Sequence, residues 1–330
     1  MKLLIAHNTV SEDSHPDDRD VLIQAGAVQG ALERLGHSVG RLPCDLDLKE
    51  SRCRLISDRP DLVFNLVESL AGTGRLIAFF PALLDAMGQP YTGAGAEAIY
   101  LSSNKVLAKS SLQAAGLPTP LWTSLEHLRA DPSVARQATH WVIKSVWEHA
   151  SIGIDEDAIS VHPTAENLVA GLHRRAPLLG GSCFAEAFID GREFNLALLD
   201  GPDGVQVLPP AEILFEGYGP DQVRIVDYSA KWDETSYAYH HTPRNYDFSR
   251  EDQALVQRLI RLSIDCWKLL GLRGYARVDF RVDRQLRPWI LEVNANPCLS
   301  PDAGFAAALD RAGVSFDKAV ERIVSSTMKS

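Results

Sequence analysis

The strongest constraint on the fold is a predicted β-hairpin in the segment from Gly274 to Pro297. Two runs of alternating polar and apolar residues flank the polar turn DRQLR, a pattern typical of paired antiparallel strands. Residues two apart on a strand point to the same face of a sheet. With the turn centred on Gln285 and Leu286, one face is expected to carry four polar side chains, Arg277, Asp279, Glu292 and Asn294. The other face is expected to carry core residues, namely Val278, Phe280, Leu291 and Val293.

These four polar side chains predict a metal site. In the expected register Asp279 faces Glu292, and directly paired Cβ atoms lie ~5 Å apart, so the two carboxylates would raise each other's pKa by repulsion. A divalent cation removes that repulsion, and carboxylate and amide oxygens are the hard ligands that suit Mg²⁺ held together with phosphate oxygens. The alternative is a solvent-exposed polar face on which Arg277 neutralises one acid. The register, and the sequence NANP after the second strand, favour metal binding by Asp279, Glu292 and Asn294.

The first 100 residues have the pattern of a doubly wound α/β domain. Strand-like runs over 2–7, 38–42 and 61–65 alternate with helical patterns. In the first helix, apolar residues recur at four- and three-residue steps, and Gly36 supplies a stop signal. A further helix is expected over 74–86. Strands that alternate with helices predict a parallel sheet covered by helices.

The rest of the chain predicts α+β structure. A helix over 104–115 precedes a small unit over 141–188, in which short strands accompany one helix at 165–173. A third region begins near Arg192 with strands and a polar loop over 217–243. A strong helix over 255–269 then leads into the hairpin and the terminal helices. Domain boundaries are therefore expected near 100 and 190.

The chain is acidic, with 33 Lys+Arg against 43 Asp+Glu and a formal net charge of -10. Nucleic-acid and membrane-surface binders favour a basic face, so neither partner is expected, whereas a small polyanion held by a few local cations fits. No apolar run approaches the ~20 residues of a spanning helix, and the amino terminus lacks a signal-peptide pattern. We therefore expect a cytoplasmic protein. The five scattered cysteines predict neither a disulfide framework nor a zinc site.

A site for metal and phosphate needs further cations, and Lys105 and Lys144 are candidates. Lys144 ends an apolar strand just before the turn-like sequence WEHASIGI. By itself, a lone lysine is more often a solvated surface charge. The chain contains neither GxxxxGK[ST] nor GxGxxG, which argues against P-loop and Rossmann dinucleotide sites.

Several segments, taken in order, resemble those of the ATP-grasp superfamily and, within it, the D-alanine–D-alanine ligase group. They are DRDVLIQAGAVQGALERLGHSV, GQPYTGAGAEAIYLSSNKVLAK, WVIKSVWEHASIGI, FAEAFIDGREFNLALLDG, DYSAKW, ARVDF and ILEVNANP. The resemblance covers nearly the whole chain. It implies an ATP-grasp fold with an N-terminal doubly wound α/β domain over 1–100, a small central lid domain over 101–190 and a C-terminal α+β domain over 191–330.

The resemblance also implies roles for individual residues in binding ATP and Mg²⁺, or Mn²⁺ in its place. The implied nucleotide ligands are Lys105 and Lys144 for the α- and β-phosphates, Glu186 with the backbone of Ala187 and Ile189 for adenine, Glu193 for the ribose and Lys231 for the γ-phosphate. Ser151 would belong to a loop that covers the phosphates, and Arg277 would stabilise an oxyanion of the substrate. Without the resemblance, FAEAFIDGREF would be interpreted as a plain edge strand and turn.

The implied reaction joins a small-molecule carboxylate to an amine through an acylphosphate, at the expense of ATP. Phosphoryl transfer of this kind depends on positioning and charge neutralisation. Several positions that contact substrates in the family differ here, and these are Asp18, Ala150, Trp232, Cys298 and the pair Ala303–Gly304. We therefore expect a ligase with an altered substrate pocket rather than a standard D-alanyl-D-alanine synthase.

Two alternatives remain at the level of sequence. One is a catalytically degenerate nucleotide-binding module that regulates a partner, although Arg277, Asp279, Glu292 and Asn294 are all retained. The other is an ATP-grasp enzyme that transfers the activated carboxylate to an acceptor other than an amine. The family resemblance further implies a homodimer.

Overall fold

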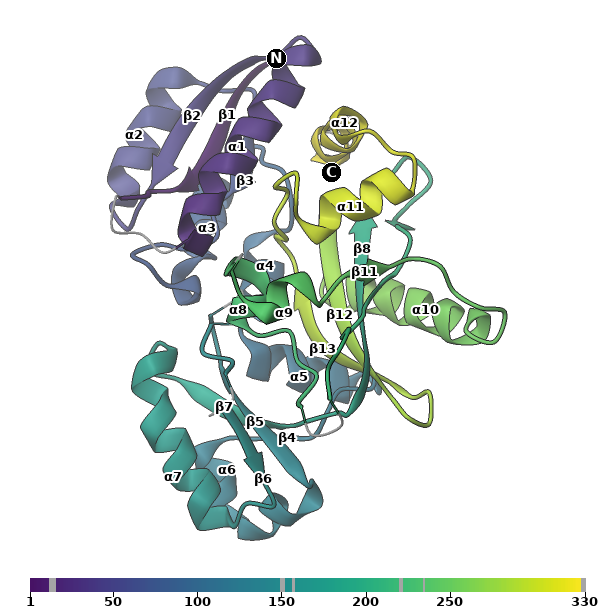
Figure 1. Cartoon of the computed structure of the whole chain (residues 1–330). Helices are drawn as coiled ribbons and strands as arrows, with labels where there is room; N and C mark the ends of the chain where they lie inside the picture. Colours follow the sequence, from purple (N-terminus) through teal and green to yellow (C-terminus); the bar gives the residue numbers. More distant parts are fainter. Residues whose placement is uncertain (12–15, 149–151, 156–157, 220–221, 234, 328–330) are drawn as a thin grey trace.

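The computed structural model describes residues 1–11, 16–148, 152–155, 158–219, 222–233 and 235–327, and the side chains of residues 16–18 lie outside this description. The first part is a three-stranded parallel sheet in the order β2-β1-β3. Its strands are β1 (Lys2–Asn8), β2 (Ser38–Cys44) and β3 (Leu62–Leu66), and its helices are α1 (Pro16–Arg34), α2 (Leu48–Asp58) and α3 (Phe79–Met87). The alternation of parallel strands and helices confirms the predicted α/β character (Figure 1).

Two helical details of this part differ from the sequence prediction. The helix α2 was not predicted, because only Ser51 and Leu55 of its residues are buried and its apolar periodicity is weak. The single helix expected over 74–86 is divided into a short 3₁₀ turn, η1 (Gly74–Leu76), and α3. Thr73 caps that turn, because its side chain accepts a hydrogen bond from the backbone of Arg75.

The central part is a four-stranded antiparallel sheet in the order β4-β7-β5-β6. It contains β4 (Trp122–Thr123), α6 (Leu125–Ala130), η2 (Pro132–Gln137), β5 (His140–Ser145), β6 (Ile159–Val161), α7 (Ala165–Arg175), η4 (Ala176–Leu179) and β7 (Cys183–Ala187). Trp141, Ile143, Leu168 and Leu172 are buried together between the sheet and its helices. This small unit forms the lower part of the molecule in Figure 1.

The largest sheet follows the order β11-β10-β8-β12-β13, with β9 paired to β8. Its strands are β8 (Gly191–Leu199), β9 (Gln206–Val207), β10 (Ala211–Ile213), β11 (Arg244–Asn245), β12 (Tyr275–Asp283) and β13 (Pro288–Asn294). Three helices share a hydrophobic core with it, namely α4 (Ala96–Ser103), α5 (Lys105–Ala114) and α10 (Gln253–Leu269). The short helices α8 (Tyr228–Trp232) and α9 (Tyr237–His240) lie in the loop before β11.

The last two helices, α11 (Gly304–Arg311) and α12 (Phe316–Thr327), join the first sheet to the largest one. Phe305, Val320 and Ile323 share one buried core with residues of β1, α1 and β8. The amino- and carboxyl-terminal parts are thus packed together, while the division at 100 and 190 stays a prediction. Within the described ranges, no helix combines the length and apolar character needed to cross a membrane.

The hairpin of β12 and β13 has the predicted register where the polar side chains lie. Arg277 pairs with Asn294, and Asp279 pairs with Glu292. Beyond Asp279 the register shifts at a β-bulge, so Phe280 pairs with Ile290. An extra residue in one strand changes which face the following side chains occupy.

The bulge makes one sequence expectation wrong. Leu291 was expected in the core, but Ile290 is buried there in its place. Leu291 instead is half-buried and lines a cavity between the central and largest sheets. Val278, Phe280 and Val293 are buried as predicted.

Candidate active site

Two adjoining cavities lie where the three parts of the chain meet. The narrower cavity lies between the central sheet and β8, β12 and β13, and it is lined partly by Val142, Phe184 and Leu291. The larger has a volume of about 780 Å³ and reaches from the amino-terminal part to α8 and α11. Residues that line both cavities include Glu193, Lys231, Asp279 and Glu292. Two ligands, one in each cavity, would therefore meet at this cluster of charged side chains.

Asp279 lies at this junction with its charge already balanced. Arg277, two residues earlier on β12, donates from Nε to Asp279 Oδ1 at 2.8 Å and from a terminal nitrogen to Oδ2 at 2.9 Å. Asn195 on β8 donates to the same Oδ1 at 2.8 Å. The contact between Arg277 and one acid is the one that the alternative interpretation of the hairpin described. The face is nevertheless half-buried within a cavity and is not an open surface.

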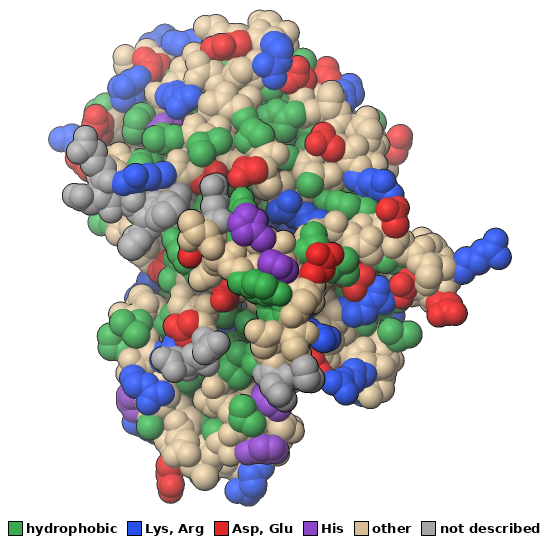
Figure 2. All heavy atoms as spheres, viewed as in Figure 1, with side chains coloured by type: hydrophobic (Ala, Val, Ile, Leu, Met, Phe, Trp, Pro, Cys, Tyr) green, Lys and Arg blue, Asp and Glu red, His purple; other side chains and the backbone are tan. Residues whose placement is uncertain are grey.

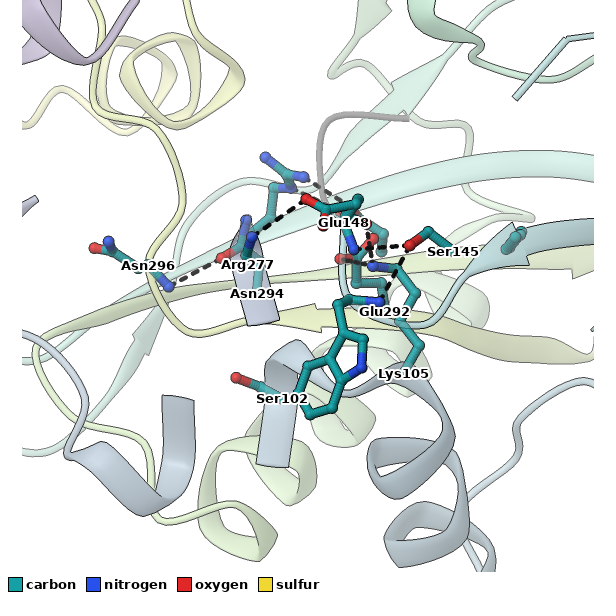
Figure 3. A network of polar contacts seen from close by, with 12 residues as sticks. Ser102, Lys105, Ser145, Glu148, Arg277, Glu292, Asn294 and Asn296 are labelled. Atoms are coloured by element: carbon teal, nitrogen blue, oxygen red, sulfur yellow. Dashed lines mark hydrogen bonds and ion pairs between the residues drawn. The ribbon is translucent and has the colours of Figure 1, made fainter. Parts of the chain in front are cut away.

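Glu292 and Asn294 lie on β13, and Glu292 pairs directly with Asp279 on β12. Figure 3 shows Glu292 and Asn294 in one polar network with Arg277 and Lys105. Lys105 Nζ lies 3.4 Å from Glu292 Oε1 and donates to the backbone oxygen of Glu148 at 2.7 Å. The side-chain oxygen of Asn294 accepts a hydrogen bond from the backbone of Asn296 at 2.9 Å. The predicted metal ligands are thus brought together, and Lys105 is brought to them from α5.

The turn after β5 is shaped by a single hydroxyl group. Ser145 Oγ donates to the backbone of Leu179 and accepts hydrogen bonds from the backbone of Trp147 and Glu148. The Glu148 carboxylate in turn accepts hydrogen bonds from Thr73 Oγ1 at 2.8 Å and from the backbone of Gly74 at 3.2 Å. This turn therefore ties the central part to the amino-terminal part, next to Lys105, one of the predicted phosphate ligands.

Glu186 lies on the central strand β7 with its carboxylate between two lysines. Lys144 Nζ on β5 is 2.5 Å from Oε1, and Lys109 on α5 forms an ion pair with Oε2. Burial alone would raise the pKa of Glu186, but the two ammonium groups more than offset it and hold the pKa below its usual value. Because β7 pairs with both β4 and β5, the edge-strand interpretation of this segment is wrong.

The other predicted nucleotide ligands line the narrower cavity. The backbone N–H of Ala187 donates to the carbonyl oxygen of Leu121 at 2.8 Å. The backbone group of Ala187 that could bind a nucleobase is therefore its carbonyl oxygen, as a hydrogen-bond acceptor. Ile189 lies beside it in the cavity wall. Glu193 on β8 is buried, and its Oε2 lies 3.6 Å from Arg281 Nε. Burial raises the pKa of this carboxyl above its usual value.

Lys231 and Trp232 come from α8, which Asp227 caps by accepting a hydrogen bond from the backbone of Ala230. Lys231 lines both cavities. Desolvation of its ammonium group by the surrounding protein, followed by repulsion from the Arg277 charge, lowers the pKa of Lys231. Trp232 lines the larger cavity, and its buried indole Nε1 has no hydrogen-bond partner among the described residues.

Cys298 faces an acidic residue that sequence reasoning missed. Its thiol donates to Asp20 Oδ2 at 2.8 Å, and Ser300 Oγ donates to Asp20 Oδ1 at 2.7 Å. Burial, followed by the negative charges of Glu68 and Asp20, raises the pKa of Cys298 well above its usual value. Asp18, and not Asp20, was predicted to contact the substrate. It lies on α1, but its side chain, together with Ala150 and Ser151, falls outside the described residues.

Besides Asp20, two residues of the site were missed, Lys109 and Asn195, although the sequence carries a signal for all three. Lys109 follows Lys105 by one helical turn, so both face the same side of α5. Asn195 follows Glu193 by two residues on one strand, which places both on the same face. Asp20 lies in the same acidic helix start as Asp18, and its contacts with Cys298 and Ser300 depend on how α1 packs against the segment after β13.

A small antiparallel unit over a larger sheet, with carboxylates, an amide and several cations at the junction, defines an ATP-grasp ligase. Residues 112–325 match the family model described as D-ala D-ala ligase C-terminus. A D-alanine–D-alanine ligase of Gloeobacter violaceus is 30% identical over 334 aligned positions, covering 97% of this chain and 99% of the relative. One of Aquifex aeolicus is 28% identical and covers 93% and 96%. The chain therefore belongs to the D-alanine–D-alanine ligase family and is an ATP-dependent carbon–nitrogen ligase.

The comparison with solved structures supports the same fold. The D-alanine–D-alanine ligase of Bacillus anthracis complexed with ATP has a TM-score of 0.74 at 19% identity, covering 100% of this chain and 98% of that one. The ligase of Coxiella burnetii has a TM-score of 0.71 at 17% identity, covering 99% and 94%. The predicted ATP-grasp fold is thus confirmed over the length of the chain.

Proposed function

We propose that this ligase uses ATP and Mg²⁺ to join a small carboxylate to an amine, in a substrate pocket that differs from that of a D-alanyl-D-alanine synthase. The observation that carries the proposal is the junction of the two cavities. Glu193, Lys231, Asp279 and Glu292 line both of them. A nucleotide in the narrower cavity and a carboxylate in the larger one would meet at these groups, as phosphoryl transfer between them requires.

The donor set of the hairpin fits a divalent metal. Asp279, Glu292 and Asn294 offer two carboxylates and an amide oxygen on adjacent strands, and such hard ligands suit Mg²⁺, or Mn²⁺ in its place. The carboxylates already attract positive charge, from Arg277 on Asp279 and from Lys105 on Glu292. When bound, the metal would neutralise phosphate oxygens during transfer.

In the first step a carboxylate oxygen of the substrate attacks the γ-phosphorus, and ADP leaves to give an acylphosphate. Lys105, Lys144 and Lys231 are the side chains that would bind and orient the phosphates. They come from α5, β5 and α8 and line the narrower cavity together. Exclusion of water from this cavity would protect the acylphosphate from hydrolysis.

In the second step the amine nitrogen attacks the acyl carbon, loses a proton, and phosphate leaves. The tetrahedral intermediate carries negative charge on the former carbonyl oxygen, and Arg277 is the nearby donor for it. Arg277 holds Asp279 in the structure. To act in this step, the guanidinium would exchange its hydrogen bonds with Asp279 for one with the substrate oxygen.

The larger cavity supports the idea of an altered substrate. Its volume of about 780 Å³ is shared between the substrates and the space beside Lys231, Asp279 and Glu292. Trp232 and Cys298 line it, and neither offers the hydroxyl group of a tyrosine or the free backbone of a glycine. The pocket also contains Asp20 and Glu68, which would attract an amine.

No observation favours the alternative of a degenerate regulatory module, because Arg277, Asp279, Glu292 and Asn294 are gathered at one site. Nucleic acid is not an expected partner, and Figure 2 shows basic and acidic side chains interspersed over the face in view. A homodimer and a cytoplasmic location remain predictions.

The experiment that tests the proposal is a screen for ADP release. The protein is incubated with Mg²⁺, ATP and mixtures of amino acids, hydroxy acids and short peptides, and active mixtures are resolved by mass spectrometry of the product. We expect an amide product other than D-alanyl-D-alanine and little ADP release with D-alanine alone. Efficient D-alanyl-D-alanine formation would overturn the altered pocket, and an ester or thioester product would overturn the amine acceptor.

A further inference from the structure

Behind the narrower cavity lies a lysine that the proposed mechanism does not use. The side chain of Lys109 is 1% exposed, and it forms an ion pair with Glu186, whose side chain is 2% exposed. A charged group is rarely buried to this extent unless it is paired. The burial of Lys109 therefore needs an explanation in terms of Glu186.

Lys109 is held in place by a chain of hydrogen bonds from the largest sheet. Its Nζ donates to Thr119 Oγ1 at 2.9 Å, and that hydroxyl donates to the backbone oxygen of Ile290 at 2.9 Å. Ile290 is the buried residue at the bulge of β13. Lys109 thus connects a carboxylate of the central sheet to the strand that carries Glu292.

Glu186 has a second cation, and this one is exposed to the cavity. Lys144 Nζ lies 2.5 Å from Glu186 Oε1, and Lys144 and Glu186 both line the narrower cavity. Lys144 is also the side chain expected at the phosphates. While it contacts Glu186, it occupies Oε1 of a carboxylate that lines the cavity together with Val142 and Phe184.

We propose that Lys109 is a positioning residue for the nucleobase: it keeps Glu186 ionised and fixed from behind, so that Lys144 can leave for the phosphates and Oε1 can accept a hydrogen bond from a 6-amino group of a purine. The inference rests on the proposed use of ATP. Without Lys109, a single lysine would have to neutralise the buried carboxylate and bind phosphate at once. The carboxylate would then either keep Lys144 or take up a proton, and both results remove the acceptor for the 6-amino group.

The test compares ATP with inosine triphosphate, which carries an oxygen in place of the 6-amino group. Dissociation constants of both nucleotides with Mg²⁺ are measured by titration calorimetry without a carboxylate substrate, for the unaltered chain, Lys109→Met, Glu186→Gln and the double variant. We expect the unaltered chain to prefer ATP, and Lys109→Met to reduce that preference by about 10-fold or more, the value of a hydrogen bond to a buried charged group. Glu186→Gln should reduce the preference for ATP by a similar factor. In the double variant, the added Lys109→Met change should reduce this preference little further.

The outcomes separate this role from a structural one. An unchanged ATP preference in folded Lys109→Met, or a full effect of Lys109→Met in the Glu186→Gln background, would overturn the inference. If Lys109→Met does not fold, Thr119→Val replaces it, since that change loosens Lys109 without removing its charge. A several-fold loss of preference is expected for Thr119→Val, and no loss would overturn the inference. If the unaltered chain binds neither nucleotide, the proposed function itself has failed.

Discussion

Arg277 and Asp279, two residues apart on the same face of β12, neutralise each other through two hydrogen bonds of 2.8 and 2.9 Å from the guanidinium to the carboxylate. Paired contacts of this type between a guanidinium and a carboxylate are among the stronger polar interactions in proteins. The group expected to stabilise the substrate oxyanion is thus held by a group expected to bind the metal. A cation bound at Asp279 would therefore compete with Arg277 for this carboxylate.

The hairpin carboxylates should be essential for turnover. The combined change Asp279→Asn and Glu292→Gln removes both negative charges and leaves only amide ligands, which bind Mg²⁺ poorly. We expect Mg²⁺-dependent ADP release to be abolished in a coupled assay. As a matched control, Glu50→Gln with Asp203→Asn removes two exposed acids elsewhere in the chain and should leave the rate unchanged. Unaltered turnover in the hairpin variant would show that the metal assignment is wrong.

Replacement of Arg277 should separate the two steps of the reaction. Arg277→Gln removes the oxyanion donor, so amide formation should slow by a factor on the order of 10²–10³. ATP binding should change much less, because the phosphates are assigned to lysines. The change also leaves Asp279 without its cation, so we expect a lower melting temperature that Mg²⁺ partly restores. Equal losses in nucleotide affinity and amide formation would contradict the assigned role.

The sequence predicted the site best where side chains from one local element converge. The pairing of Asp279 with Glu292 follows from strand alternation alone, because alternation fixes the face of every second residue. Once the bulge intervenes, the same rule fails for Leu291, since a bulge depends on packing that a hairpin pattern does not encode. Contacts between distant segments, such as Asp20 with Cys298, were beyond local pattern reasoning.

Family resemblance supplied what local patterns could not. Lys144 and Glu186 are separated by 42 positions in the sequence. The resemblance assigned both to one nucleotide, and both side chains line the narrower cavity. It gave no role to Lys109 or Asn195, although each directly contacts a predicted ligand. Supporting residues of this kind become visible only when the side chains are placed in space.

The pKa of Cys298 makes a prediction about alkylation. Because burial and the charges of Glu68 and Asp20 raise this pKa well above its usual value, the thiol stays protonated near pH 8, and the thiolate is the reactive form. We expect iodoacetamide at pH 8 to modify the exposed Cys53 long before Cys298, as followed by peptide mass spectrometry. Equal modification rates at the two cysteines would contradict the raised pKa.

The same group should contribute to stability in a pH-dependent way. A thiol whose pKa is higher in the folded chain than in the unfolded one stabilises the fold below the unfolded pKa, and this contribution is lost as the pH rises above ~8.5. We expect the melting temperature to fall above that pH. The melting temperature of the Cys298→Ala variant should fall less steeply over the same pH range. Parallel curves for the two proteins would show that Cys298 does not contribute.

Gly191 at the start of β8 should be among the positions least tolerant of a side chain. Its φ is 156°, and an added Cβ would lie 1.9 Å from the backbone oxygen of Val282 on the paired strand β12. Since backbone cannot move aside as a flexible side chain can, Gly191→Ala must part the two strands next to Glu193. We expect a loss of at least about 1–3 kcal/mol in the free energy of unfolding, measured in urea. Gly26→Ala, in the middle of α1, meets only an ordinary contact with Arg41 and should be neutral or stabilising. If the two variants unfold at the same urea concentration, the close approach of β8 and β12 at Gly191 does not constrain the fold.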